Sequence, residues 1–233
     1  SADAARLKGI YVIDRFPDTW DAVDLTHTLS PDMSCYPGTE PPVFSGACTL
    51  ETHGFAERRI AIYSHTGTHV DAPSHILPQG AALDDFGPER FVGPGTALDL
   101  RGLDGPVIRP EDLAPFQSEI EGRDFLLLCT GRSGRWGRKS YYEAYPVLTP
   151  EAARWLAGFR PKGVGVDAIS VDPMDTETFP VHRLFLERDI LIIENLTRLE
   201  ALLGREFLLC CLPLKIEGAD GAPVRAVAFL PGR

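Results

Sequence analysis

The run Phe125-Leu126-Leu127-Leu128-Cys129 contains no charged or amide side chain, which is typical of a strand that is covered on both faces of a sheet. A helix signal follows, with Thr149 as the expected N-cap and Pro150 at the first helical position. Residues 163–166 then form another short run of the buried-strand type. Because a helix that links two neighbouring strands leaves them parallel, these pieces predict a βαβ unit in the C-terminal half of the chain.

Further strand candidates flank this unit on both sides. They lie at residues 22–26, 60–63 and 96–100 before it, and at residues 189–193, 206–214 and 224–230 after it. A short helix is expected at residues 197–203 and a turn at residues 218–221. Antiparallel elements early in the chain and a parallel unit late in it predict an α/β fold with a mixed sheet.

The composition fits one globular domain. The chain has 233 residues, of which 44% are apolar, and its 20 prolines and 22 glycines are scattered rather than gathered into a linker. We therefore expect a short N-terminal arm over residues 1–20 and a single domain over residues 21–233. The 23 basic and 33 acidic residues give a net charge of −10, which argues against nucleic acid as a partner.

Membrane and disulfide-rich classes are disfavoured as well. No apolar run reaches the roughly 18 to 20 residues that a membrane span requires, and the first residues lack the apolar core of a secretory signal. Five cysteines, an odd number, argue against a disulfide framework. We therefore expect a reduced, cytoplasmic protein.

The strongest chemical signal is the segment Ser64-His65-Thr66-Gly67-Thr68-His69-Val70-Asp71-Ala72-Pro73-Ser74-His75. It contains three of the chain's six histidines together with one carboxylate, and these are donor types that Zn²⁺ and Mn²⁺ prefer. Gly67 and Pro73 argue against a helix. The donors at positions 65, 69, 71 and 75 share one parity, so an extended chain would point them to one face.

A fully extended backbone would nevertheless spread these donors too far apart for one metal ion. From residue 65 to residue 75 it would span about 33 Å at roughly 3.3 Å per residue. We therefore expect bends at Gly67 and Pro73 and a shaped loop at a strand end. The alternative is a polar loop whose imidazoles bond to neighbouring carbonyls, and this interpretation suits a single histidine better than four donors.

A second group of polar residues gives a weaker signal when its residues are judged alone. Glu194 directly follows Leu191-Ile192-Ile193, and a buried carboxylate there is costly unless it is paired or binds a metal. His182 falls in an expected loop, where it could be a plain surface residue. Asp167 and Asp172 follow another strand, and each could support a ligating histidine or cap a turn.

Together these motifs resemble a known family. The segment from His65 to His75 looks like the signature of the Putative cyclase superfamily, which includes the bacterial kynurenine formamidases. Further similarities are the Tyr36-Pro37-Gly38 loop, residues 165–173, the pair His182 and Glu194, and residues 212–215 and 221–226, which resemble the family's closing strands. The resemblance covers roughly residues 22–230.

The resemblance implies a layered β/β/α fold of the swivelling type and a metal-dependent hydrolase of C–N bonds other than peptide bonds. The residues that it implies as ligands of two divalent ions are His65, His69, Asp71, His182 and Glu194. Asp71 would bridge the two ions, with Glu194 as a second candidate for a bridge, and His75 would be the catalytic proton shuttle. Zn²⁺ is the expected metal with Mn²⁺ as the alternative, and members of the family are usually homodimers or larger homo-oligomers.

The implied reaction is the hydrolysis of an aryl formamide, N-formylkynurenine to kynurenine and formate, by a metal-activated water. Tyr36 would line the pocket for the aromatic substrate, but the family's formamidases typically carry tryptophan there, which leaves a similar aryl amide open. The same site would also suit a cyclic amide such as isatin. A metal-binding protein without catalysis is the remaining alternative, and its site would be closed by four protein ligands.

Overall fold

The computed structural model describes residues 20–232. The expected N-terminal arm, residues 1–20, therefore lies outside the described residues except for its last residue, with which the first strand begins. The α-helices are α1 (Leu50–His53), α2 (Pro110–Leu113), α3 (Gln117–Ile120), α4 (Pro150–Ala157) and α5 (Pro180–Leu186). Between residues 20 and 232, none of them has the length and apolar character that crossing a membrane requires.

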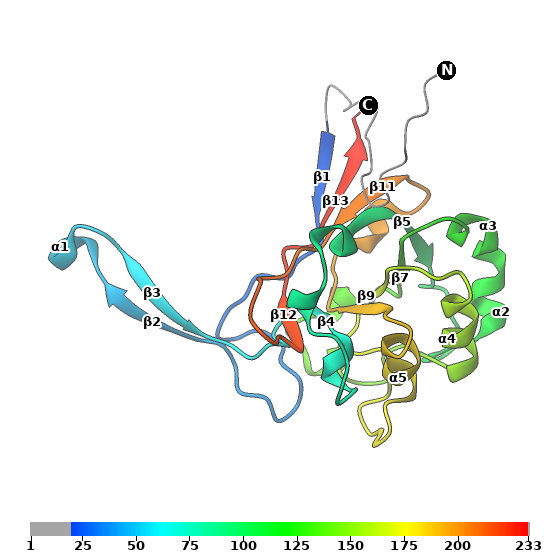
Figure 1. The fold of residues 1–233 in the computed structure, drawn as a ribbon, viewed down its shortest axis with the longest axis horizontal. Helices are drawn as coiled ribbons and strands as arrows, with labels where there is room; N and C mark the ends of the chain where they lie inside the picture. Colours follow the sequence, from blue (N-terminus) through cyan, green and yellow to red (C-terminus); the bar gives the residue numbers. More distant parts are fainter. Residues whose placement is uncertain (1–19, 233) are drawn as a thin grey trace.

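Nine strands form one curled, mixed sheet (Figure 1). In spatial order they are β1 (Trp20–Asp24), β13 (Val227–Pro231), β11 (Phe207–Cys210), β5 (Val92–Asp99), β7 (Phe125–Cys129), β9 (Gly163–Val166), β10 (Leu191–Glu194), β4 (His69–Asp71) and β12 (Gly221–Pro223). The four central strands, β5, β7, β9 and β10, are parallel, and the pairings outside them are antiparallel. The expected α/β class with a mixed sheet is confirmed.

The predicted βαβ unit is present as β7, α4 and β9. Every residue of β7 is buried, as its uninterrupted apolar run requires. The hydroxyl of Thr149 accepts the backbone N–H of Ala152 at 3.1 Å, and Pro150 is the first residue of the helix. The chain then returns to pair β9 with β7 in parallel. A capped helix of this length therefore spans the crossover between two neighbouring strands.

The two faces of the central sheet are covered differently, and this difference produces the layers. Leu126 and Leu128 belong to the core shared with α2, α4 and α5. Leu127 points to the opposite face and belongs to a core that includes Val70 of β4 and Leu209 of β11. The outer strands of the curled sheet thus cover one face and the helices cover the other. This is the expected β/β/α arrangement.

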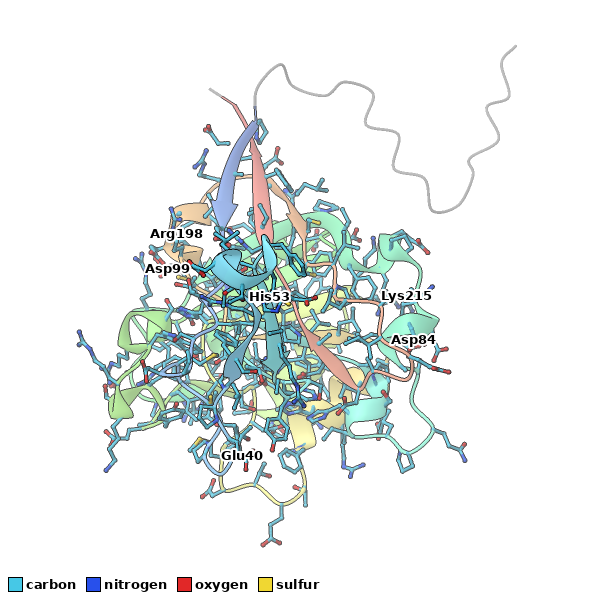
Figure 2. All side chains as sticks on the ribbon, turned by 90° about the vertical axis from the view of Figure 1, so that its left-hand side faces the viewer. Glu40, His53, Asp84, Asp99, Arg198 and Lys215 are labelled. Atoms are coloured by element: carbon cyan, nitrogen blue, oxygen red, sulfur yellow. The ribbon has the colours of Figure 1, made fainter. Side chains whose placement is uncertain are left out.

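A second, two-stranded sheet projects from the body. It pairs β2 (Val43–Cys48) with β3 (Glu57–Ala61) and carries α1 at its tip (Figure 1). We call residues 43–63 the arm, which is distinct from the N-terminal arm expected over residues 1–20. In Figure 2, which looks along the arm toward the body, His53 of α1 lies in front of the body. Every residue of β3 is exposed. The last remaining pair, β6 (Val107–Ile108) and β8 (Val147–Leu148), is a short parallel sheet near the helices.

Three local expectations differ from the structure. Residues 69–71, expected within a loop, form the buried strand β4. The chain after the turn near residue 218 does not return directly to β11, because residues 221–223 first form β12 beside β4. The helix expected at residues 197–203 is a single 3₁₀ turn, Leu199–Leu202. In the first two cases, pairing across the sheet decides the local structure, and such pairing leaves no mark in a short segment.

Candidate metal centre and active site

His65, His69 and Asp71 converge because the backbone bends where the sequence predicts. Gly67 has a φ of 69°, a left-handed conformation that glycine adopts without a steric penalty. Pro73 begins a 3₁₀ turn. With the backbone bent in this way, the Nδ1 atom of His65 lies 2.7 Å from Oδ1 of Asp71, and the Nε2 atom of His69 lies 3.2 Å from the same oxygen. Three donors from one segment therefore surround one point.

Two more donors reach this point from other parts of the chain. Glu194 ends β10, and the antiparallel pairing of β10 with β4 places it opposite His69. His182 comes from α5 and is 4% exposed. The sequence-based interpretation of His182 as a residue of a surface loop is therefore wrong. Its Nε2 atom lies 3.5 Å from Oε1 of Glu194 and 3.8 Å from Oδ2 of Asp71.

The donors form two groups that share Asp71, and they fit divalent metal. One group is His65, His69 and Asp71, and the other is Asp71, His182 and Glu194; within each, the donor atoms lie within 4.8 Å of one another. The Oδ2 atom of Asp71 is buried and has no hydrogen-bond partner, which is costly for a carboxylate unless a cation satisfies it. The 3.5 to 3.8 Å separations in the second group also exceed hydrogen-bond lengths.

The ligand histidines are held in orientation by acceptors on their outer side. The Nδ1 atom of His69 lies 2.7 Å from the carbonyl oxygen of Gly67, and that of His182 lies 2.7 Å from Oδ2 of Asp172. With Nδ1 donating in each case, the Nε2 lone pair faces the shared carboxylate, as in many metal sites. Asp172 also accepts backbone N–H groups at the start of α5. It therefore fulfils both roles that the sequence left open.

Asp167, the companion of Asp172 in the sequence analysis, has a different role. Its carboxylate accepts the backbone N–H groups of Thr130 and Gly131 at 3.0 and 2.8 Å. It therefore caps the turn after β7, and neither of these hydrogen bonds involves a ligand histidine. Of the two possibilities that the sequence left open, the structure supports the turn cap.

The electrostatics of the centre favour positive charge. Burial disfavours the charged form of Asp71, yet His69 and His65 hold its pKa well below the usual range. Burial also opposes charge on His65, but Asp71 and then Asp220 outweigh it and raise the pKa of His65 to about 9. His182 behaves alike, because Asp172 and Glu194 overcome burial and raise its pKa to about 10. A cation and protons would therefore compete for the same nitrogens.

His75 stands beside the metal-ligand groups. Its ring lies 3.9 Å from that of His65, centroid to centroid, and 6.0 Å from that of His182. Burial lowers the pKa of His75 below its ordinary value, in contrast to the two ligand histidines. His75 lines a cavity of about 310 Å³ that His65, His69, His182 and Glu194 also reach. It is therefore placed to meet a small molecule bound against the donors.

Aromatic rings form the outer wall of this cavity. They belong to Tyr36, Tyr63 and Phe179. The hydroxyl of Tyr36 donates to the carbonyl oxygen of Met174 at 3.4 Å, and 39% of the residue is exposed. The ring of Phe179 meets His182 edge-on at 5.9 Å. The cavity thus has a polar, metal-fitting floor and aromatic walls.

The sequence analysis missed two residues of this region. The side-chain nitrogen of Asn195 donates to the carbonyl oxygen of Gly67 at 2.9 Å, and the hydroxyl of Tyr141 donates to the Asn195 side-chain oxygen at 2.7 Å. The Oδ2 atom of Asp220 lies 3.2 Å from Nε2 of His65. Asn195 could have been noticed because it follows Glu194. No local signal marks Asp220, which pairing between β12 and β4 brings into place.

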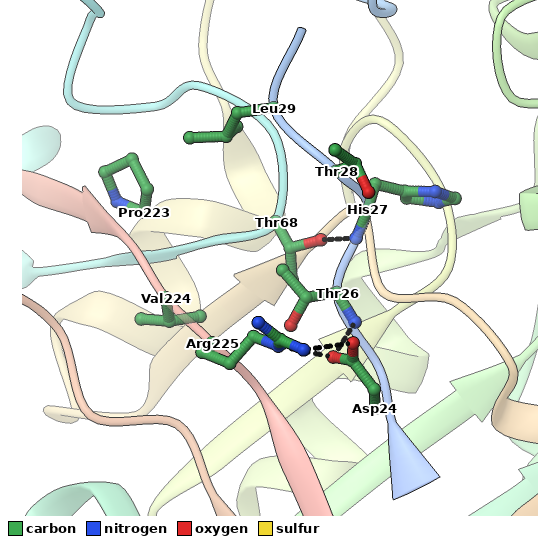
Figure 3. Close-up of a pocket in the computed structure, with 9 residues that line it drawn as sticks. All are labelled: Asp24, Thr26, His27, Thr28, Leu29, Thr68, Pro223, Val224 and Arg225. Carbon is green, nitrogen blue, oxygen red and sulfur yellow. Dashed lines mark hydrogen bonds and ion pairs between the residues drawn. The ribbon is translucent and has the colours of Figure 1, made fainter. Parts of the chain in front are cut away.

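A separate cavity of about 350 Å³ is lined by Asp24, residues 26–29, Thr68 of the ligand segment and residues 223–225 (Figure 3). Asp24 and Arg225 form an ion pair at its floor, with a shortest distance of 2.7 Å. The backbone N–H of His27 donates to the hydroxyl of Thr68, which itself donates to the carbonyl oxygen of Asn195. This region braces the ligand segment, and its lining shares no residue with the two metal-fitting groups.

Comparison with known proteins agrees with this architecture. The family model described as Putative cyclase matches residues 23–173. The kynurenine formamidase of Salinibacter ruber (strain DSM 13855 / M31) is 33% identical over 207 residues, which cover 88% of this chain and 95% of that protein.

Solved structures give a similar result. Isatin hydrolase A from Labrenzia aggregata is 28% identical, with a TM-score of 0.81 over 91% of this chain and 94% of that one. Another isatin hydrolase, bound to the product analogue thioisatinate, has 23% identity and a TM-score of 0.83 over 91% of this chain and 93% of that one, and it shares the fold. With most of its length covered by the family model and by these relatives, the chain belongs to the Putative cyclase family.

Proposed function

We propose that this protein, a metal-dependent hydrolase of C–N bonds other than peptide bonds, acts on an aryl formamide of the N-formylkynurenine type. Water would add to the formyl carbon and the C–N bond would break, which yields formate and the free arylamine kynurenine. The observation that carries the proposal is the convergence of five donors, four of which line one cavity together with His75 and three aromatic side chains. The similarity to kynurenine formamidases supports the same substrate class.

The residues that would hold metal are the two groups joined by Asp71. His65 and His69 would bind one ion with Asp71, and His182 and Glu194 would bind a second with the same carboxylate. We propose two divalent ions, Zn²⁺ or else Mn²⁺, because imidazole and carboxylate oxygen suit both metals. Such ions would lower the pKa of a bound water to about 7, and they would act as Lewis acids toward a carbonyl oxygen.

The protein's own side chains would position the substrate and move the proton. The aromatic walls, Tyr36 above all, would hold the aryl ring by stacking, since the Tyr36 hydroxyl is already bonded to the carbonyl oxygen of Met174. His75 reaches the cavity without belonging to the two groups joined by Asp71. It would take a proton from the attacking water and give it to the leaving nitrogen.

A cyclic aryl amide such as isatin is the second candidate substrate. It is supported by the similarity to isatin hydrolase A and needs no change in the proposed roles, because opening a lactam is the same attack on an amide carbonyl. Non-catalytic metal binding is less well supported, because structural sites are closed by protein ligands whereas these donors face a cavity of about 310 Å³.

A substrate panel tests the proposal. The protein, reconstituted with Zn²⁺ or Mn²⁺, should hydrolyse N-formylkynurenine, and isatin should be the poorer substrate. The His75→Ala variant should lose about 10²- to 10⁴-fold in kcat, the usual contribution of a general acid–base group, with its metal content unchanged. Full activity after complete metal removal, or an unchanged kcat in His75→Ala, would contradict the scheme.

We further propose that the protein is a homo-oligomer in which the arm contacts a second copy of the chain. Of the ten exposed large apolar side chains among residues 20–232, six lie in the arm and three lie at positions 212, 214 and 216. A two-stranded ribbon is marginally stable alone, and apolar patches of this kind mark interfaces.

The oligomer proposal is tested by light scattering after gel filtration. Ile60→Asp should convert the oligomer into monomers, whereas Ile60→Val should not. A wild-type protein that is monomeric at micromolar concentration would contradict the proposal.

We also propose that residues 21–233 form the hydrolase domain and that the protein is cytoplasmic. The five free thiols support the cytoplasmic location.

A further inference from the structure

Asp220 is the one carboxylate of the site that the proposed function leaves without a role. Its side chain is 47% exposed, whereas those of Asp71 and Glu194 are 1% and 7% exposed. It lies 155 residues from His65 in the sequence. It nevertheless lies beside two imidazoles that line the cavity, those of His65 and His75.

The backbone around Asp220 is fixed by its pairing with the ligand strand. Gly221 lies opposite Asp71 in the ladder between β12 and β4, and the carbonyl oxygen of Asp220 accepts the N–H of Ala72 at 2.9 Å. A Cβ atom on Gly221 would lie 2.5 Å from Cε1 of His65. The backbone therefore packs directly against the His65 ring, which contacts His75 as well.

One oxygen of Asp220 faces both imidazoles. Oδ2 lies 3.2 Å from Nε2 of His65 and 3.7 Å from Nδ1 of His75. The other nitrogen of His65, Nδ1, faces Asp71. His65 therefore has an inner and an outer nitrogen, as His69 has with the carbonyl of Gly67 and His182 has with Asp172. Asp220 is the only one of these three outer acceptors that a further imidazole shares.

We infer that Asp220 is a positioning residue that holds the metal ligand His65 by a hydrogen bond and, with the same oxygen, orients the proton-transfer group His75 electrostatically across 3.7 Å. The inference rests on the proposed function for the role of His75, but not for the role of His65. An outer acceptor fixes the ring of a ligating histidine and raises its basicity. By facing Nδ1 of His75, the same oxygen leaves the Nε2 side of that ring for the substrate.

Metal affinity tests the first half of the inference without any substrate. We would titrate the metal-free wild-type protein, Asp220→Ala and Asp220→Asn with Zn²⁺ in competition with a chromophoric chelator. Asp220→Ala should bind one ion about 10- to 100-fold more weakly, the usual effect of losing such an acceptor. Asp220→Asn keeps an acceptor oxygen and should lose less. Glu217→Ala, which removes an exposed carboxylate of the same loop, is the matched control and should bind as the wild type does.

The stoichiometry separates a positioning residue from a ligand. His65, His75 and Asp220 could themselves hold a metal ion. At saturating Zn²⁺, Asp220→Ala should bind the same number of ions per chain as the wild type. The loss of one ion, or an unchanged affinity, would overturn the inference about His65.

A double-mutant cycle tests the second half with any aryl amide that the wild type hydrolyses. At saturating metal, Asp220→Ala should lower kcat on the order of 10-fold, a part of what a general acid–base group contributes, and leave KM nearly unchanged. In a His75→Ala background, it should lower kcat no further. Additive losses would overturn the link to His75. Failure of N-formylkynurenine as a substrate would overturn the proposed function alone, because the metal titration does not depend on it.

Discussion

The two donor groups that share Asp71 are built in opposite ways. The first takes His65, His69 and Asp71 from one short segment, and the side chain of His65 is 23% exposed. The second draws Asp71, His182 and Glu194 from β4, α5 and β10, and their side chains are 1% to 7% exposed. The first group thus depends on local bends and has one partly exposed member, His65, whereas the second depends on the whole sheet and is buried throughout. We expect the second group to release its metal ion last.

Removing the shared carboxylate should have the largest effect. In Asp71→Asn, both groups lose the charge that joins them, so both ions should bind weakly and activity should fall about 10³-fold or more, since bound metal contributes several kcal/mol to such reactions. The measurement is kcat/KM at saturating Zn²⁺. A variant within tenfold of the wild type would show that Asp71 does not bridge the groups.

Single-group variants should separate the buried group from the exposed one. His182→Ala leaves the buried Asp172 without its imidazole partner, which costs about 1–3 kcal/mol. His65→Ala removes one partner of Oδ1 of the buried Asp71, but this oxygen keeps His69 at 3.2 Å. The side chain of His182 is 5% exposed against 23% for His65, so removing it also leaves the more buried cavity. Thermal unfolding of the metal-free proteins should therefore give a Tm several degrees lower for His182→Ala. Equal values would mean that the two groups do not differ in burial energy.

The same contrast explains what the sequence could predict of the site. His65, His69 and Asp71 share a segment, so donor types, parity and the bends at Gly67 and Pro73 indicated a metal group without other information. His182 was expected in a loop, because the carboxylate that caps α5 and holds its ring lies ten residues earlier. Only the family resemblance pointed to it. Sites assembled across a sheet leave no local pattern.

Crowding the first group alone should have an intermediate effect. In Gly221→Ala, the new Cβ would lie 2.5 Å from the His65 ring, so the ring must move. We expect one ion to bind about 10- to 100-fold more weakly, with the second unaffected, in a chelator competition with Zn²⁺. Gly134→Ala, where a Cβ meets nothing within 4 Å, is the control. Weakening of both ions would show that the groups are not separable.

The effect of pH should distinguish metal-free from loaded protein. The pKa values of His65 and His182 are raised to about 9 and about 10 in the metal-free protein. Protonation of a group whose pKa is raised by folding stabilises the native state fully below its unfolded pKa, near 6.5, and this stability is lost as pH rises through the folded pKa. The Tm of the metal-free protein should therefore fall between pH 7 and pH 10, and Zn²⁺ affinity should rise. A metal-free protein that gains stability over this range would contradict the assignment.

The smallest effect is expected at Tyr36, which lines the cavity but belongs to neither donor group. Tyr36→Trp restores the tryptophan that is typical of the formamidases. A larger stacking face is worth about 0.5–1.5 kcal/mol, so KM for N-formylkynurenine should fall by a few-fold to about tenfold while kcat stays constant. Steady-state kinetics measure both. A raised KM would indicate that the pocket is shaped for a different aryl amide.

The fold shows the same division between local and distant information. The apolar run of β7 and the capped helix α4 predicted the βαβ unit. Burial on both faces of β7 and the cap by Thr149 each depend on residues that are neighbours in the sequence, so both can be recognised there. For β12, the residues alone predicted only a turn that ends at its first residue, Gly221, and the family resemblance alone indicated a strand; β2 was not predicted. β12 depends on pairing with β4, and β2 lies in the arm, where exposed residues lack the alternation that marks a half-buried strand.

The metal content of the purified protein tests the central claim most directly. Elemental analysis should find two divalent ions per chain in the wild type and fewer than one in Asp71→Asn. A wild-type protein that contains no divalent ion, or an Asp71→Asn variant that keeps both ions, would contradict the claim that Asp71 joins two metal sites.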